Sequence, residues 1–293
     1  MSDPFEALLR PPEAVDPDPT FAARLRARLE RELLDHRDPR GTRMSTSSTT
    51  STPSAPAVPR HGDVGYVSLR VPDVGRAADF YQAVLGWRYA PGGDPRGRQV
   101  QGLALNHGMW AEEGSRTLWA CYRVDDVHAA VRRVREAGGR AEEPSREPYG
   151  TISTCVDDQG LSFGVYEVFG DRPAEVSSRQ GEIVYLTVEV PDADRARAFY
   201  GSVLGWEFVP GNVDQGWRVR LGGGEVRPMT GLWGGRDRAA VVPMYSVEDI
   251  DAGVARVRAA GGTSTDPERQ PYGVTAECAD DQGVRFYLGR LPG

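Results

Sequence analysis

The chain carries one sequence pattern twice. The stretch AFYGSVLGWEF at residues 198–208 matches DFYQAVLGWRY at residues 79–89, and Tyr200 follows Tyr81 by 119 residues. An internal period of this length is the size of a domain, and 293 residues are enough for two domains with hydrophobic cores. The sequence therefore predicts two copies of one fold in a single chain.

The period changes partway through each copy. Cys278 follows Cys155 by 123 residues, and Asp280 follows Asp157 by the same interval. The second copy must therefore hold four extra residues before Gly231. We expect them in a hairpin, so that the copies share a scaffold but do not bind in the same way.

Each copy contains two similar modules. VGYVSLRVPD at 64–73 alternates as a half-buried strand does, and Asp73 precedes a helical apolar stripe that ends at Gly86. RTLWACYRVDD at 116–126 begins the pattern again, and short strands follow it. The prediction is an α+β protein with four strand–helix–strand–strand–strand modules.

The N-terminal segment differs from both copies. Phe21, Leu25, Leu29 and Leu33 recur every four residues, which predicts a helix with one narrow apolar stripe. We expect this arm to contact its own chain or a homodimer partner, or to dock a foreign partner. The expected parts are the arm at 1–43, a flexible Ser/Thr/Pro linker at 44–62, the first domain at 63–170, a linker at 171–181 and the second domain at 182–293.

Composition narrows the class of protein. A formal net charge of −7 argues against a nucleic-acid binder, and no apolar run approaches the length of a membrane span. The three cysteines form no zinc-like cluster, and their odd number suits a reducing compartment. All 35 basic residues are arginine, which is typical of a GC-rich bacterium. We therefore expect a cytoplasmic protein.

The repeated motifs carry a resemblance to a known family. VSLRVPD, ADFYQAVLGW and VDDQG in the first copy, with LTVEVPD, RAFYGSVLGW and ADDQG in the second, are similar to those of the vicinal oxygen chelate superfamily. That superfamily includes glyoxalase I, bleomycin-resistance proteins and extradiol dioxygenases. The resemblance implies a curved sheet around a cup in each copy, with helices on the convex side and a ligand on the concave side.

Strand alternation indicates which residues face the cups. Aromatic side chains are frequent among them, and aromatic faces bind planar or apolar molecules without a strict hydrogen-bond pattern. By contrast, Trp87 and Trp206 directly follow helices and are expected in the core. The expected ligand-binding residues are Tyr66, Ser68, Arg70, Trp110, Trp119, Cys121, Arg123, Tyr185, Thr187, Glu189, Trp217, Trp233, Met244 and Tyr287.

The resemblance also implies where a metal ion would bind. Metal enzymes of the family carry His, Gln or Glu at cup-side positions that correspond here to Tyr66, Trp119, Gly164, Tyr185, Val242 and Tyr287. None of these supplies the imidazole, carboxylate or thiolate that zinc, nickel or ferrous iron prefers. His107 is the nearest candidate for the remaining position, with Thr230 as its counterpart. We therefore expect neither a metal site nor a cofactor.

Three functions remain open. The first is a metal-independent protein, similar to bleomycin-resistance proteins, that sequesters a small, partly aromatic molecule. The second is a metal-free isomerase, lyase or cyclase in which His107 is the base, Tyr66 or Tyr149 is the acid, and Arg70 and Arg123 hold an anion. The third is an interaction protein that recruits a partner through its arm, and a metal-dependent glyoxalase or dioxygenase is disfavoured. His107, Arg70 and Arg123 favour the first cup as the functional one.

Overall fold

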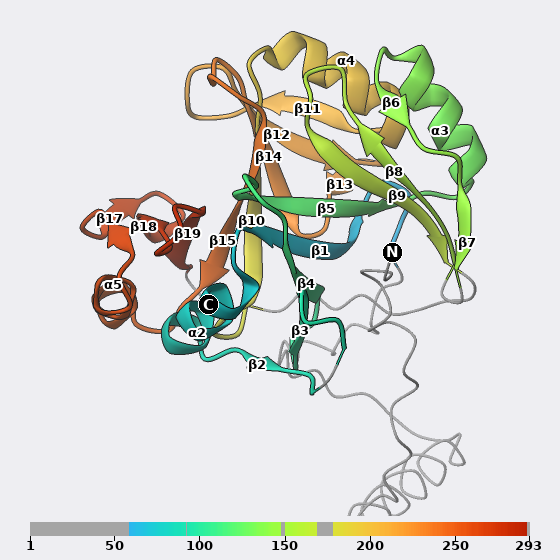
Figure 1. Cartoon of the computed structure of the whole chain (residues 1–293). Helices are drawn as coiled ribbons and strands as arrows, with labels where there is room; N and C mark the ends of the chain where they lie inside the picture. The colour runs from blue at the N-terminus through green and yellow to red at the C-terminus, as the bar shows by residue number, and fades with distance from the viewer. Residues whose placement is uncertain (1–58, 92, 148–149, 169–177, 292–293) are drawn as a thin grey trace, which may run out of the picture. The chain divides into compact units, whose positions relative to one another are not determined.

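The computed structural model describes residues 59–91, 93–147, 150–168 and 178–291 (Figure 1). The expected amphipathic helix, and all but the last residues of the Ser/Thr/Pro linker, lie outside these residues. The two repeats belong to one compact unit. No helix in the described ranges combines the length and the apolar character that crossing a membrane requires.

The first repeat forms one sheet in the order β2-β3-β4-β1-β5-β9-β8-β6, with β7 paired to β8. At its centre β1 pairs in parallel with β4 and antiparallel with β5, which joins the two modules. Its elements are β1 (Val64–Val71), α2 (Val74–Leu85), β2 (Arg88–Tyr89), β3 (Gly97–Gln101), β4 (Asn106–Ala111), β5 (Thr117–Arg123), α3 (Val127–Glu136), β6 (Arg140–Ala141), β7 (Ser145–Glu147), β8 (Gly150–Val156) and β9 (Ser162–Val168).

The second repeat follows the same plan, in the order β11-β12-β14-β10-β15-β19-β18-β16. Its elements are β10 (Ile183–Glu189), α4 (Ala193–Leu204), β11 (Glu207–Pro210), β12 (Gly216–Leu221), β13 (Gly224–Glu225), β14 (Met229–Trp233), β15 (Ala240–Ser246), α5 (Ile250–Ala259), β16 (Thr263–Ser264), β17 (Glu268–Gln270), β18 (Gly273–Ala279) and β19 (Arg285–Arg290). The α+β fold of four modules is confirmed.

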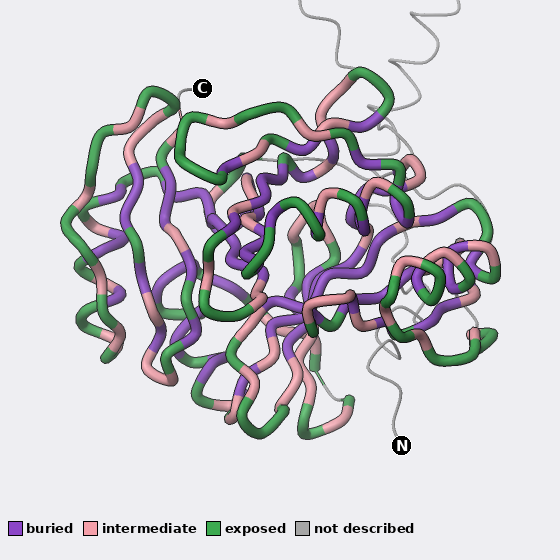
Figure 2. Tube along the Cα trace, turned by 90° about the horizontal axis from the view of Figure 1, so that it is seen from above, coloured by how far each residue is buried: buried purple, intermediate pink, exposed green. Residues whose placement is uncertain are grey.

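Local sequence signals set the helix ends. Asp73, Asp126, Asp192 and Asp249 each cap a helix with a side-chain oxygen that accepts backbone N–H groups. Gly86 ends α2 in the left-handed conformation, as predicted. Figure 2 shows buried stretches along the strands, while exposed stretches lie in the connecting loops.

The four-residue insertion lies in the β12–β14 connection. Gly97 faces Trp110 across β3 and β4, and Gly216 faces Trp233 in the same way. The interval between equivalent residues is therefore 119 for the two glycines and 123 for the two tryptophans, which places the four extra residues between them. The added strand β13 pairs with β12 here and has no counterpart among the described strands of the first repeat.

The repeated motifs build the interface between the repeats. Helix α2 packs on α5, α3 on α4, and β5 contacts β15. The Gln282 side chain forms two hydrogen bonds of 2.8 Å with the backbone of Asp73, and Gln159 repeats this pattern at Asp192. Each D-D-Q-G turn thus holds the helix cap of the other repeat.

The two core tryptophans take part in the same interface. Trp87 Nε1 donates to the Gly181 carbonyl at 3.1 Å, and Trp206 Nε1 donates to the Gly62 carbonyl at 3.0 Å. Both indoles are 3% exposed, so the expected core position is confirmed. Each acceptor directly precedes the first strand of the other repeat, so these hydrogen bonds tie each helix–strand junction to the segment that leads into the other repeat.

Candidate functional site

Strand register separates two faces of each sheet. Val67, Leu69 and Val71 are fully buried in the core, so the residues between them on β1 lie on the opposite face, as the sequence predicted. We call that face, which carries Tyr66, the first cup. The face of the second sheet that carries Tyr185 is the second cup.

Side chains of the first cup pack tightly against their own sheet. Tyr66 is 5% exposed, Trp119 4% and Cys121 1%. A Cβ at Gly164 would lie 2.5 Å from the Trp119 ring, and a Cβ at Gly108 would lie 2.0 Å from the Tyr66 hydroxyl. The two aromatic side chains therefore lie directly over glycines of neighbouring strands and present little surface to solvent.

The arginines of the first cup have partners of their own. Arg70 lies 3.7 Å from Glu112 and over the Trp119 ring, and burial lowers its pKa. Arg123 donates to the Pro59 carbonyl at 2.6 Å. Arg123 also lies 3.6 Å from Asp125, so both guanidinium groups already face a carboxylate of the first repeat.

The structure does not bring His107 and Tyr66 together, and Tyr149 lies outside the described residues. His107 is in register with Val67 and lies on the core face, 1% exposed. Because a carbonyl only accepts, Nδ1 donates to the Gly108 oxygen at 2.9 Å, and Nε2 accepts from the Tyr245 hydroxyl at 3.1 Å. Burial lowers the pKa of His107 to about 4. The expectation that His107 acts in the first cup is therefore corrected, because its side chain lies on the opposite face of the sheet.

Trp217 also lies away from the cups. It is in register with Leu232 on the core face of the second sheet, and the Arg197 guanidinium of α4 lies 3.7 Å from its ring centroid. The expected place of Trp217 in the second cup is therefore corrected. Trp110 and Trp233 do lie on the cup sides, in register with Arg70 and Glu189.

The second cup is more open than the first. Tyr185, Thr187, Trp233 and Tyr287 are half-buried, whereas Met244 lies deeper at 7% exposed. Burial raises the pKa of Tyr185 to about 12 and also raises the pKa of Tyr287. Tyr287 donates its hydroxyl proton to Glu277 at 3.3 Å, so Tyr185 is the phenol of this cup that can donate a hydrogen bond to a ligand.

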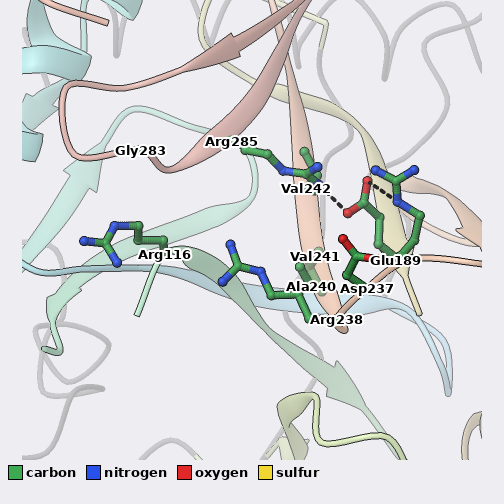
Figure 3. Close-up of a pocket in the computed structure, with 10 residues that line it drawn as sticks. Arg116, Glu189, Asp237, Arg238, Ala240, Val241, Val242, Gly283 and Arg285 are labelled. Atoms are coloured by element: carbon green, nitrogen blue, oxygen red, sulfur yellow. Dashed lines mark hydrogen bonds and ion pairs between the residues drawn. The ribbon is translucent and has the colours of Figure 1, made fainter. Parts of the chain in front are cut away.

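A cavity of about 210 Å³ opens at the edge of the second cup (Figure 3). It lies where β10 ends and β15 and β19 begin, and it also receives a side chain from the first repeat. We call it the rim cavity, and its lining includes Arg116, Glu189, Arg236, Asp237, Arg238, Val242 and Arg285.

Glu189 organises the charges of the rim cavity. Its side chain is 4% exposed, and it accepts a hydrogen bond from Arg285. Arg236 Nε lies 3.7 Å from Glu189 Oε1, and the Arg236 guanidinium also stacks 4.4 Å from the Trp233 ring centroid. The buried carboxylate thus holds two arginines beside an aromatic face of the cup.

The residues present do not fit a metal ion of the family. The six positions implied by the resemblance hold tyrosine, tryptophan, glycine and valine, and the nearest imidazole, that of His107, lies in the core. Across the part of the chain that the structure describes, no three His, Cys, Asp or Glu side chains come together as a metal site.

The arginines of the rim cavity were not among the residues predicted from the sequence. Arg116, Arg236 and Arg238 lie in loops, outside the strand alternation that was used to find cup residues. A signal was available in the repeat itself. Arg236, Arg238 and Arg285 correspond, at the interval of 123, to Glu113, Ser115 and Ser162 of the first copy.

The two repeats, each with one cup and the same interface motifs, are both matched by profiles of known families. The profile of the Glyoxalase/Bleomycin resistance protein/Dioxygenase superfamily matches residues 63–165, and a glyoxalase-like domain profile matches residues 185–289. The chain belongs to the vicinal oxygen chelate superfamily, as the sequence resemblance indicated.

Individual relatives share the two-repeat length. "Putative glyoxylase CFP32" of Mycobacterium tuberculosis is 28% identical, and the match covers 78% of this chain and 94% of that protein. Anthracycline biosynthesis protein DnrV of Streptomyces peucetius is 27% identical with the same coverage. These relatives are similar over both repeats.

Solved structures show the same fold. The Mn(II)-bound glyoxalase from Novosphingobium aromaticivorans superposes with a TM-score of 0.62 at 18% identity, over 79% of this chain and 82% of that one. An extradiol ring-cleaving dioxygenase from B. fuscum gives a TM-score of 0.60 at 18% identity, over 82% and 74%. At this identity the likeness concerns the fold alone.

Proposed function

We propose that this protein is a metal-independent binding protein, of the sequestration or resistance type, that holds a small, partly aromatic organic molecule in its second cup. The observation that carries the proposal is the half-buried aromatic surface of Tyr185, Trp233 and Tyr287 on the second cup. Aromatic faces next to a concave surface suit planar organic ligands. The name of the Streptomyces relative, an anthracycline biosynthesis protein, supports a ligand with fused aromatic rings.

Metal independence is supported by the donor set. The cup-side residues at the family's ligand positions offer phenol, indole and aliphatic groups, which bind zinc, nickel and ferrous iron poorly. Binding would then depend on aromatic stacking and on a hydrogen bond from the Tyr185 phenol. Neither contribution needs an ion.

A matched pair of tryptophans tests this proposal. Trp233 and Trp110 occupy equivalent positions in the two cups, and each has an arginine over its ring. Calorimetric titration with a panel of planar aromatic compounds should show binding that Trp233→Ala weakens by about tenfold or more, while Trp110→Ala leaves it unchanged. The proposal would be contradicted if no compound of the panel bound, or if the two variants lost affinity equally.

A second candidate is a metal-free isomerase, lyase or cyclase. Glu189 favours it, because its Oε1 atom is buried without a hydrogen-bond partner in the described residues and its side chain lines the rim cavity. A carboxylate in that position could accept a proton, a role that His107 cannot fill from the core. Turnover of a bound compound that Glu189→Gln abolishes would support this candidate over simple sequestration.

A further inference from the structure

We propose that the rim cavity binds the anionic group, a carboxylate or a phosphate, of the organic molecule in the second cup, and that it takes Arg116 from the first repeat to do so. This inference rests on the proposed function and specifies the ligand's chemistry. The binding site would then be formed by residues of both repeats.

The charges in the rim cavity favour an anion. Four arginines and two carboxylates, Glu189 and Asp237, line it, so that two positive charges are in excess. The chain as a whole has a formal net charge of −7, so this local excess is opposite in sign to the molecule. Guanidinium groups bind carboxylates and phosphates through paired hydrogen bonds.

Two of the arginines are available for a ligand. Arg116 uses Nε to donate to the Gln282 carbonyl at 2.7 Å, which orients the guanidinium and leaves its four other N–H groups. Within the described residues, neither Arg116 nor Arg238 forms an ion pair with a carboxylate. Figure 3 shows both side chains to one side of Glu189.

The fold does not require these arginines. In the first repeat the equivalents of Arg236, Arg238 and Arg285 are one glutamate and two serines, and Arg70 stands where the second repeat has Glu189. The same scaffold therefore forms with two of these charges reversed and two absent. A cluster that the scaffold can lack, built around a buried carboxylate, is better explained by binding than by folding.

The size of the cavity indicates what part of the ligand it holds. At about 210 Å³ it is smaller than the roughly 300–1,000 Å³ of sites that enclose a whole drug-sized molecule. It accommodates a charged group and a few attached atoms. Because Trp233 stacks on Arg236, the aromatic remainder of the ligand would continue along the cup from that ring.

Calorimetry with three matched probes on the full chain tests the proposal. The probes are 2-naphthoate, 2-naphthyl phosphate and the neutral 2-naphthamide. We expect at least one anion to bind about tenfold or more tightly than the amide, since charge-assisted hydrogen bonds exceed neutral ones. The anion that binds more tightly identifies carboxylate or phosphate as the natural group.

Variants then separate the possible failures. The exposed pair Arg116→Ala/Arg238→Ala should abolish the preference for the anion, while Arg96→Ala, which removes the arginine over Trp110 in the first cup, should leave it intact. Equal binding of amide and anions, or a preference that survives the double variant, would overturn the anion site and leave aromatic binding standing. Absence of binding by all three probes would overturn both proposals.

Discussion

Tyr200 donates a hydrogen bond of 2.8 Å to the buried carboxylate of Asp157, although the two residues belong to different repeats. Tyr200 comes from the F-Y motif of α4 and Asp157 from the D-D-Q-G turn of the first repeat. The motifs that recur in the sequence therefore meet across the pseudo-symmetric interface. The chain repeats itself because each copy supplies the surface that covers the other.

Tyr200→Phe should destabilise the protein by about 1–3 kcal/mol, because it leaves a buried carboxylate oxygen without its donor. Tyr81 is the matched control. It is the equivalent residue, and its hydroxyl interacts with Asp280, but neither that hydroxyl nor Asp280 Oδ2 reaches the geometry of a full hydrogen bond. Tyr81→Phe should cost less, as measured by urea unfolding at pH 7. Equal losses in the two variants would contradict this account of the interface.

Asp157 and Asp280 should give stability an unusual pH dependence. Burial raises the pKa of both carboxyl groups above 3.8, outweighing the hydrogen bonds that they accept. A raised pKa in the folded state means that the stabilising contribution is complete below the unfolded pKa and is lost as pH rises through the folded one. The free energy of unfolding, measured with urea from about pH 4 to pH 7, should fall for the wild type relative to the double variant Asp157→Asn/Asp280→Asn. A parallel pH dependence in the two proteins would exclude the effect.

His107 should behave as a structural residue. With its pKa lowered to about 4, its imidazole proton shifts should stay constant from about pH 8 to pH 5 in an NMR titration. The neutral ring contributes stability that is present above the unfolded pKa of 6.5 and lost as pH falls toward about 4. A titration midpoint near 6.5 would show that the ring is open to solvent.

Substitution of His107 gives a second prediction about the core. His107→Ala removes a ring that packs 4.6 Å from the Trp87 centroid, and it should cost about 2–4 kcal/mol of unfolding free energy. The folded fraction should still bind an aromatic probe with unchanged affinity. Loss of affinity without loss of stability would return His107 to the binding site.

Binding of an anionic probe should weaken with salt. Arg116 and Arg238 are exposed, and the interaction of exposed charges is screened as the Debye length falls from about 20 Å to about 4 Å between 0.02 M and 0.5 M salt. The affinity for 2-naphthoate should fall severalfold over this range, while that for 2-naphthamide stays constant. Equal salt dependence of the two probes would argue against a contribution from the arginines.

The sequence predicted most of the fold because its signals are local or repeated. Asp73 and Gly86 delimit a helix by backbone chemistry, and strand alternation separates Tyr66 from Val67. The insertion could be located because the interval between equivalent residues changes from 119 to 123. These features need no knowledge of distant contacts.

The site was harder to predict because it depends on register and on loops. His107 could not be aligned to one strand position, and a shift of one residue moves a side chain to the other face. Arg116 reaches the rim cavity from the other repeat, through a carbonyl contact with Gln282 that no local pattern encodes. A comparison of charges between the copies would have pointed to the arginines.

Native mass spectrometry most directly tests the central claim of metal-independent binding in the second cup. The full chain is treated with a chelator, mixed with 2-naphthoate and compared with Trp233→Ala. We expect a complex of one probe per metal-free chain, and the amount of this complex should be greatly reduced in the variant. A complex that forms only after a divalent metal ion is restored, with metal and probe adding together, would contradict it.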